Sequence, residues 1–265
     1  MLWERTDPET ALGERFGFAG MAAMARWLTE VLANRWDLRV DDVCRVVISA
    51  DNALAWARTP EGTFVVKVCA DRERFARLGM IADVVTHLGS TGVPVPVPRP
   101  ARNGSNRLQV TNGSTELSVV VQPVIAGDLL DVTDLDAVAS TGNVLARLHT
   151  AAATLVHNDV RGTNVLTRHS RVTAVLDFDE MVIDHPVVDL ARAATLLNTR
   201  FTSWDPAPPA AHAALVAGYR SVRDLGDAET AWLPALMLAL GLTHLPDGRN
   251  PDGWARSVEH LAARA

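Results

Sequence analysis

The sequence LVHNDVRGTNVLTRHSRVTAVLDFDE, residues 155–180, carries most of the information about fold and function in this chain. It sets His157, Asp159 and Asn164 in an H-x-D-x-x-x-x-N pattern, and a short apolar segment further along ends in Asp177. Phosphoryl transfer needs these residue types together: one carboxylate orients the attacking hydroxyl, while an amide and a second carboxylate hold magnesium against nucleotide phosphates. The alternative is an ordinary hairpin with polar loops, because the pattern by itself is only suggestive.

The spacing predicts how these residues meet. Gly162 would let the loop turn back, after which segments 164–166 and 172–176 form the two strands of a hairpin. Asn164 and Asp177 would then lie at adjacent strand ends. Two oxygen donors suit Mg²⁺, which takes one or two protein ligands and completes its shell with phosphate oxygens and water.

Lys67 gives independent support, because it is the only lysine among 25 basic residues. It lies in the apolar segment 63–68 after a turn at 60–62, a pattern typical of the second strand of a hairpin. An ammonium group fits between α- and β-phosphates as a point charge, and arginine is not equivalent there. The alternative is a lysine retained by chance on an exposed strand face.

Together these residues resemble the aminoglycoside phosphotransferase family, a kinase-like group that phosphorylates small molecules. The resemblance spans about residues 43–191 and is most specific in 157–164 and 175–179. It implies ATP and Mg²⁺ as cofactors, Asp159 as the catalytic carboxylate and Lys67 as the phosphate anchor. It also implies catalytic and metal-binding roles for Asn164, and a metal-binding role for Asp177. Further segments agree in order: 92–96 (GVPVP), Gly127, Leu148-His149 and 185–191.

The family pattern suggests further roles and also shows departures. Arg161 stands where protein kinases place a lysine, and it either reaches the transferred phosphate or is solvated. Asn158 replaces the usual glycine. No residue clearly matches the helix glutamate that would pair with Lys67; Glu73 is favoured over Asp83.

The same resemblance places other residues around the nucleotide and the loop. Asn52, in a loop without glycine, would lie at the nucleotide. Gln122 and Val124 would form the hinge beside the adenine, where a simple linker is the alternative. His157 and Asp189 would support the catalytic loop.

The predicted fold is α+β and protein-kinase-like, with two lobes: residues 1–121 as a nucleotide-binding lobe with an antiparallel sheet and helices, 122–127 as the hinge, and 128–265 as a mostly helical catalytic and acceptor-binding lobe. The predicted elements are a helix over 19–32, strands at 43–48, 53–58 and 63–68, a helix over 71–88, a hairpin of 107–110 with 115–122 around Asn112-Gly113, a helix over 135–149, and later helices begun by Pro234 and Pro251.

Composition limits the functional classes. The chain has 265 residues, 48% hydrophobic and 21% charged, as in ordinary globular proteins. A net charge of −6 argues against a nucleic-acid partner. No apolar run is long enough to span a membrane, and MLWERTDPET at the start lacks a signal-like region. Cys44 and Cys69 are predicted as reduced core residues on neighbouring strands of a cytoplasmic protein. The expected oligomeric state is a monomer or weak dimer.

The acceptor is less defined by sequence. Asp128, Asp179 and Glu180 are candidate contacts for a cationic acceptor such as an aminoglycoside-type antibiotic. For the acids at 128, 131, 134 and 136, helix capping with a solvated edge is the favoured alternative. Trp204, Trp232 and Trp254 are expected in the core, with an acceptor pocket lined by them as the alternative. The predicted activity is ATP- and Mg²⁺-dependent O-phosphotransfer to a small-molecule hydroxyl; the alternatives are a metabolic kinase for an amino alcohol, sugar or glycated amine, and a nucleotide-binding pseudokinase. ATP versus GTP preference stays open.

Overall fold

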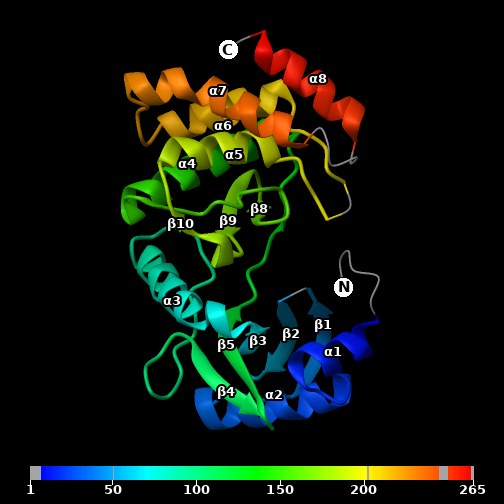
Figure 1. The fold of residues 1–265 in the computed structure, drawn as a ribbon. Coiled ribbons are helices and arrows are strands. Elements are labelled where there is room, and N and C mark those ends of the chain that lie inside the picture. The colour runs from blue at the N-terminus through cyan, green and yellow to red at the C-terminus, as the bar shows by residue number, and fades with distance from the viewer. Residues whose placement is uncertain (1–6, 50, 202, 245–249, 264–265) are drawn as a thin grey trace. The chain divides into compact units, whose positions relative to one another are not determined.

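The computed structural model describes residues 7–49, 51–201, 203–244 and 250–263. Residues 1–6, at the start of the segment MLWERTDPET, and Ala50, in the expected nucleotide loop, therefore lie outside the described residues. The chain divides into two units, Met1–His87 with Pro96–Val124, and Leu88–Val95 with Ile125–Ala265. Figure 1 shows the helices and strands that make up these units.

The first unit is built on a five-stranded antiparallel sheet in the order β1-β2-β3-β5-β4. The strands are β1 (Asp42–Ile48), β2 (Asn52–Thr59), β3 (Gly62–Cys69), β4 (Leu108–Asn112) and β5 (Thr115–Pro123). The expected strands and the hairpin around Asn112-Gly113 are thus confirmed. At that turn Gly113 has φ +57°, a conformation that glycine adopts without steric cost.

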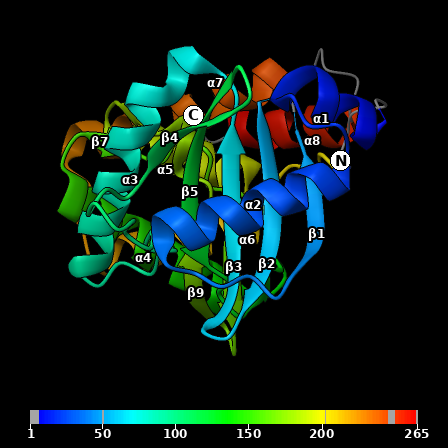
Figure 2. The same cartoon turned by 90° about the horizontal axis from the view of Figure 1, so that it is seen from below.

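Side chains of β3 alternate between the two faces of the sheet, so only every second side chain packs against α1 (Pro8–Phe16) and α2 (Met21–Trp36). Val66 and Val68 belong to an apolar core that includes Leu28 of α2 and Leu12 of α1. Figure 2 shows α2 crossing one face of the sheet. Because successive strand residues point to opposite faces, Lys67 lies on the other face.

The far face of the sheet is partly covered by α3 (Phe75–Ser90), whose Phe75 and Leu78 pack against Cys69. A short 3₁₀ turn, η1 (Arg72–Arg74), precedes α3, so the helix expected over 71–88 starts later than predicted. The prediction for the cysteines was wrong for Cys44, which is exposed on β1 beside a bulge, with β2 between its strand and that of Cys69. Among the described residues, neither cysteine forms a disulfide.

The second unit is mostly helical, as expected. Its helices are α4 (Leu135–Ala152), α5 (Pro186–Leu196), α6 (Pro209–Arg220), α7 (Asp227–His244) and α8 (Pro251–Ala262). Helices α4 and α6 approach closely because Gly142 and Gly218 face each other's backbones, where an added Cβ would collide with main-chain atoms. Pro251 begins α8 as predicted, whereas Pro234 lies inside α7 and not in its first turns.

Two small sheets carry the loops of the second unit. One has the order β6 (Asp128–Leu129), β8 (Val165–Arg168), β9 (Arg171–Val175); the other pairs β7 (Leu155–Val156) with β10 (Val182–Ile183). The hairpin predicted from residues 155–180 is therefore confirmed as β8–β9. Residues 88–95, expected in the first lobe, group with the second unit because Val175 N–H donates to Pro94 O at 2.9 Å and Arg147 donates to Gly92 O.

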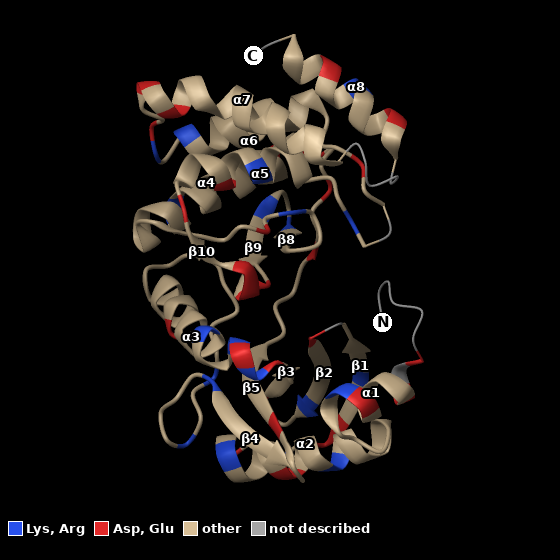
Figure 3. Cartoon of the chain, viewed as in Figure 1, with Lys and Arg blue, Asp and Glu red and all other residues tan. Residues whose placement is uncertain are grey.

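Acidic and basic residues are distributed through the elements of both units (Figure 3). In the described part of the chain, no helix has the length and apolar character needed to cross a membrane.

Candidate active site

Asp159 and Asn164 are held together by the loop between β7 and β8. Asn164 Nδ2 donates to Asp159 Oδ2 at 2.7 Å and to Asp159 O at 2.9 Å. Asn164 N–H also donates to Arg161 O at 2.8 Å, which closes the loop tightly. Gly162 is needed here for a close approach and not for turning the chain, because an added Cβ would lie 2.8 Å from Leu197 O.

The hairpin brings Asp177 to the same strand ends. Val165 pairs with Val175, and Leu176 N–H donates to Asn164 O at 2.8 Å, so Asp177 follows directly after the residue bonded to Asn164. Asp177 has φ +60°, which costs a non-glycine residue about 1 kcal/mol or more. Backbone strain of this kind is common where a side chain must be aimed at a functional site.

The residues fit a magnesium ion. The Asn164 amide nitrogen is committed to Asp159, which leaves its oxygen, 3.5 Å from the Thr163 hydroxyl, as an acceptor for a cation. Asp177 adds a carboxylate. Among the described residues no group of three or more His, Cys, Asp and Glu could hold a metal by itself. An amide and a carboxylate are a donor set that substrate phosphates complete, as Mg²⁺ requires.

Asp189 of α5 holds the start of the catalytic loop. Its carboxylate accepts from His157 N–H at Oδ2 and Asn158 N–H at Oδ1, both at 2.9 Å. His157 is fully buried; its Nε2 lies 2.9 Å from Leu176 O, and its Nδ1 accepts from Asp159 N–H at 3.2 Å. These hydrogen bonds place both residues at the start of the loop, and their supporting roles stay a prediction.

Asn158 shows why a glycine is usual at its position. Its φ is +67°, in the left-handed region, where asparagine is among the best tolerated non-glycine residues. Both of its neighbours in the chain are fixed by hydrogen bonds: His157 N–H to Asp189 and Asp159 N–H to His157. The substitution is thus compatible with the loop conformation.

Burial raises the pKa of the Asp159 carboxyl above its usual value. The charge of Arg161 and the hydrogen bond from Asn164 act in the opposite direction, while the charge of Asp177 raises this pKa further. The side chain is only 22% exposed, which is why desolvation dominates. A carboxylate with a raised pKa is a better proton acceptor near neutral pH, as general-base work requires.

Arg161 faces Asp159 and is not simply solvated. Its Nε lies 3.2 Å from Asp159 Oδ1, an ion pair without hydrogen-bond geometry, and the arginine side chain is 17% exposed. Its guanidinium carbon is 5.9 Å from the centre of the Trp204 ring.

The tryptophan predictions had different outcomes. Trp254, which donates from its ring nitrogen to Trp204 O, is buried as predicted. Trp232 is 61% exposed, so the core prediction for it was wrong.

In the first unit, Lys67 lies on the central strand β3, between Leu54 of β2 and Val120 of β5, and is 8% exposed. Asn52 N–H donates to the Ser49 hydroxyl at the β1–β2 turn. Glu73 is exposed in η1, where its N–H donates to Asp71, so its pairing with Lys67 stays a prediction.

The predicted hinge residues lie at the end of β5. Gln122 Nε2 donates to Pro96 O at 2.9 Å, and Val124 N–H donates to Thr63 O at 3.0 Å. Val124 is 42% exposed, and the first unit ends at this residue, within the expected hinge 122–127.

Among the acceptor candidates, Asp128 is exposed on β6, while Asp179 is buried and Glu180 exposed in η2 (Phe178–Glu180), directly after Asp177. Asp134 is the N-cap of α4, accepting from Ala137 N–H at 3.0 Å, as the capping alternative predicted.

His149 and Tyr219 extend the hydrogen bonds of Asp189 into the helices, which the sequence did not indicate. His149 Nε2 lies 3.0 Å from Asp189 Oδ2, and His149 Nδ1 lies 2.8 Å from the Tyr219 hydroxyl. His149 was noted only as part of the family pattern. The available signal for Tyr219 was that it is the one tyrosine of the chain.

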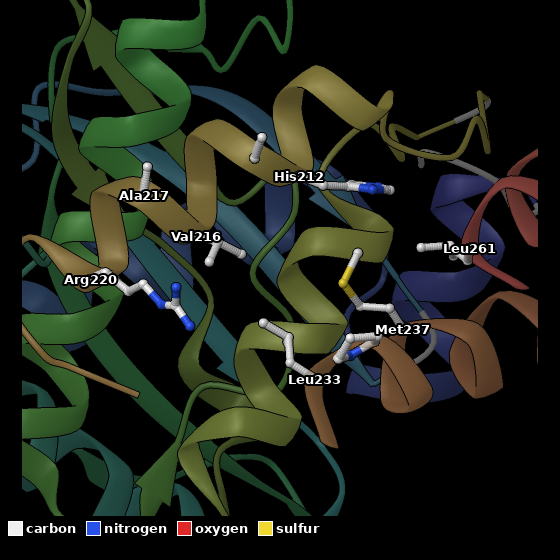
Figure 4. Close-up of a pocket in the computed structure, with 9 residues that line it drawn as sticks. His212, Val216, Ala217, Arg220, Leu233, Met237 and Leu261 are labelled. Carbon is white, nitrogen blue, oxygen red and sulfur yellow. The ribbon is translucent and has the colours of Figure 1, made fainter. Parts of the chain in front are cut away.

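A cavity of about 430 Å³ lies between α6, α7 and α8 and contains none of the predicted site residues. Figure 4 shows Val216, Leu233 and Met237 around it, with His212 and Arg220 as its polar neighbours.

The fold and the candidate site together define a class: an α+β protein of kinase-like fold with an H-x-D-x-x-x-x-N loop. Comparison with known proteins agrees. The model of a phosphotransferase enzyme family matches residues 42–155 and 150–233, more than half of the chain. The chain belongs to the phosphotransferase enzyme family, which confirms the resemblance seen in the sequence and makes the protein a phosphotransferase.

Solved structures of small-molecule kinases share the fold. A microcompartment-associated aminopropanol kinase is 19% identical with a TM-score of 0.65, over 89% of this chain and 94% of that one. An amicoumacin kinase is 14% identical with a TM-score of 0.68, over 89% and 91%. A macrolide 2′-phosphotransferase from Brachybacterium faecium is 17% identical with a TM-score of 0.60, over 89% and 97%. No curated protein sequence matches the chain closely enough to count as a relative.

Proposed function

We propose that the protein transfers the γ-phosphate of ATP, with Mg²⁺, to a hydroxyl group of a small molecule. The observation that carries this proposal is the Asp159–Asn164 pair at the strand ends that lead to Asp177. Asp159 would orient the acceptor hydroxyl and take its proton late in the transfer. Asn164 and Asp177 would hold the ion, which when bound would neutralise charge on the phosphate oxygens.

Lys67 and Arg161 supply the positive charge in this proposal. Lys67, on the sheet face away from α2, would bind the α- and β-phosphates. Arg161, already paired with Asp159, would stabilise charge on the transferred phosphate once acceptor and nucleotide are bound. Asn52, Gln122 and Val124 would contact the nucleotide, with Val124 beside the adenine.

A small-molecule acceptor is supported by the family and by the structural neighbours, which are an aminopropanol kinase, an amicoumacin kinase and a macrolide phosphotransferase. An aminoglycoside-type antibiotic is one candidate, with Asp128, Asp179 and Glu180 as contacts for its ammonium groups. An amino alcohol, sugar or glycated amine is the metabolic alternative. We place the protein in the cytoplasm as a monomer or weak dimer, acting without nucleic acid.

The deciding experiment measures nucleotide diphosphate release with ATP or GTP and Mg²⁺ across a panel of antibiotics, amino alcohols, sugars and glycated amines. Acceptor-dependent release, with the phosphorylated product identified by mass spectrometry, supports transfer. Tight Mg²⁺-dependent nucleotide binding without product for any acceptor would instead favour the pseudokinase alternative.

A further inference from the structure

A chain of buried hydrogen bonds leads from the catalytic loop into the helices of the second unit. Asp189 accepts from the backbone amides of His157 and Asn158 and lies 3.0 Å from His149 Nε2. The other ring nitrogen of His149 lies 2.8 Å from the Tyr219 hydroxyl. His149 is 3%, Asp189 1% and Tyr219 0% exposed, so water cannot replace a lost partner.

The chemistry of the partners fixes the protons along this chain. Burial alone would raise the pKa of Asp189, but its hydrogen bonds, of which the one from His149 contributes most, help to hold that pKa below its usual value. An ionised Asp189 only accepts hydrogen bonds, so His149 Nε2 must carry a hydrogen. Burial raises the pKa of Tyr219 to about 12, so its hydroxyl keeps its proton and can donate to His149 Nδ1 in the tautomer that carries hydrogen on Nε2.

Tyr219 is itself held by a second pair of residues. Arg223 makes two hydrogen bonds to Glu229, at 3.2 and 2.8 Å, and its guanidinium carbon lies 5.8 Å from the Tyr219 ring centre. Both charged side chains are less than one-third exposed. This pairing anchors the end of α6 to the first turns of α7, close to the tyrosine.

We propose that Tyr219 is a positioning residue for the catalytic loop, because its hydroxyl hydrogen-bonds His149 Nδ1 and so fixes the ring orientation and the tautomer in which Nε2 carries the hydrogen. That form donates to Asp189, which in turn holds the amides of His157 and Asn158. The loop needs such an anchor because Asn158 has a left-handed backbone, which is costly outside glycine. The effect on turnover rests on the proposed phosphoryl transfer; the hydrogen-bond arrangement of His149 does not.

Tyr219→Phe removes the hydroxyl and keeps the ring. Thr141→Val is the matched control, because Thr141 is also buried, on α4 with His149, and its hydroxyl donates only within its own helix to Ala137 O. We expect Tyr219→Phe to lower kcat about three- to tenfold with KM for ATP within about twofold, and Thr141→Val to leave both near wild type. Equal effects of the two substitutions on kcat would overturn the proposal.

A double-mutant cycle with His149→Gln tests whether Tyr219 acts through the imidazole. Glutamine keeps an N–H donor for Asp189 but offers Tyr219 no ring nitrogen. Tyr219→Phe should then change kcat by less than about twofold in the His149→Gln background, because the interaction it removes is already absent. The same loss in both backgrounds would show that the tyrosine acts by another route.

The ¹⁵N resonances of the histidine rings give a readout that needs no activity. The His149 signals, assigned by their loss in His149→Gln, should show hydrogen on Nε2 and a hydrogen-bonded, unprotonated Nδ1 at neutral pH. Asp189 and Tyr219 contact this ring, and Glu229 interacts with it electrostatically. Hydrogen on Nδ1 in the wild type would refute the proposal even if turnover is normal. The expected spectrum in a protein without turnover would reject only the phosphotransfer assignment.

Discussion

Asn164 donates to the Asp159 side chain at 2.7 Å and to the Asp159 carbonyl at 2.9 Å, so one amide fixes both the carboxylate and the backbone behind it. This leaves the Asn164 oxygen for a cation and keeps one Asp159 oxygen beside Arg161. The two proposed functions of the loop, metal binding and hydroxyl activation, are therefore mechanically linked through one side chain.

Asp159→Asn should lower kcat by about 10²–10⁴-fold, because an amide cannot accept the acceptor proton. Nucleotide affinity should stay within about threefold, as measured by calorimetric titration with ATP and Mg²⁺. Asp136→Asn, an exposed acid in the first turn of α4, is the control and should keep wild-type turnover. Turnover near the wild-type rate in Asp159→Asn would exclude Asp159 as the proton acceptor.

Mg²⁺ should increase the affinity of the wild-type protein for ATP. Asp177→Asn should make this increase smaller by a factor of about ten or more, because one of the two ion ligands loses its charge. Asparagine is chosen because it tolerates the φ of +60° found at Asp177, so a backbone effect is kept small. Binding is compared in Mg²⁺ and in EDTA. An unchanged ratio of the two affinities would remove Asp177 from the metal site.

Arg161→Gln should move the acid limb of the kcat/KM pH profile to higher pH. The charge of Arg161 lowers the pKa of Asp159, so its removal raises that pKa further above the usual value and the reactive carboxylate forms only at higher pH. The overall rate should also fall if Arg161 stabilises the transferred phosphate. An acid limb that stays in place or moves to lower pH contradicts the proposed coupling.

The Asp159 carboxyl also predicts a dependence of stability on pH. Its folded-state pKa lies above the unfolded value, so its contribution to stability is fully present below the unfolded pKa and is lost as pH rises through the folded pKa. Asp159→Asn should therefore be at least as stable as wild type at neutral pH, as measured by urea unfolding. A lower free energy of unfolding there would show that the ionised carboxylate is net stabilising.

Gly142→Ala should lower the free energy of unfolding by about 1–3 kcal/mol or more, because the new Cβ meets the backbone of Leu215 and Tyr219 and pushes α4 from α6. Gly79→Ala on α3 is the control: its Cβ meets nothing within 4 Å, so helix propensity should stabilise the protein by up to about 1 kcal/mol. Similar effects of the two substitutions in urea unfolding would mean that α4 and α6 accommodate the added Cβ without loss of stability.

Local signals in the sequence were sufficient for much of the fold. Alternation of apolar residues gave β1, β2 and β3, and the Asn112-Gly113 turn gave the β4–β5 hairpin, because these patterns act over a few residues. The order of β5 next to β3 and the place of residues 88–95 in the second unit required contacts between distant segments, such as Val175 with Pro94. Cys44 and Trp232 were misplaced because apolar residues also occur on exposed faces.

The sequence by itself determined the class of chemistry: the spacing sets Asn164 and Asp177 at the two ends of one hairpin and Asp159 in the loop just before it, since strand pairing leaves little freedom over so short a stretch. Only the tertiary structure decided what holds that loop in place. Asp189, His149 and Tyr219 come from three helices, and their hydrogen bonds depend on how α4, α5 and α6 pack. Such packing is set by long-range contacts, which no local pattern encodes.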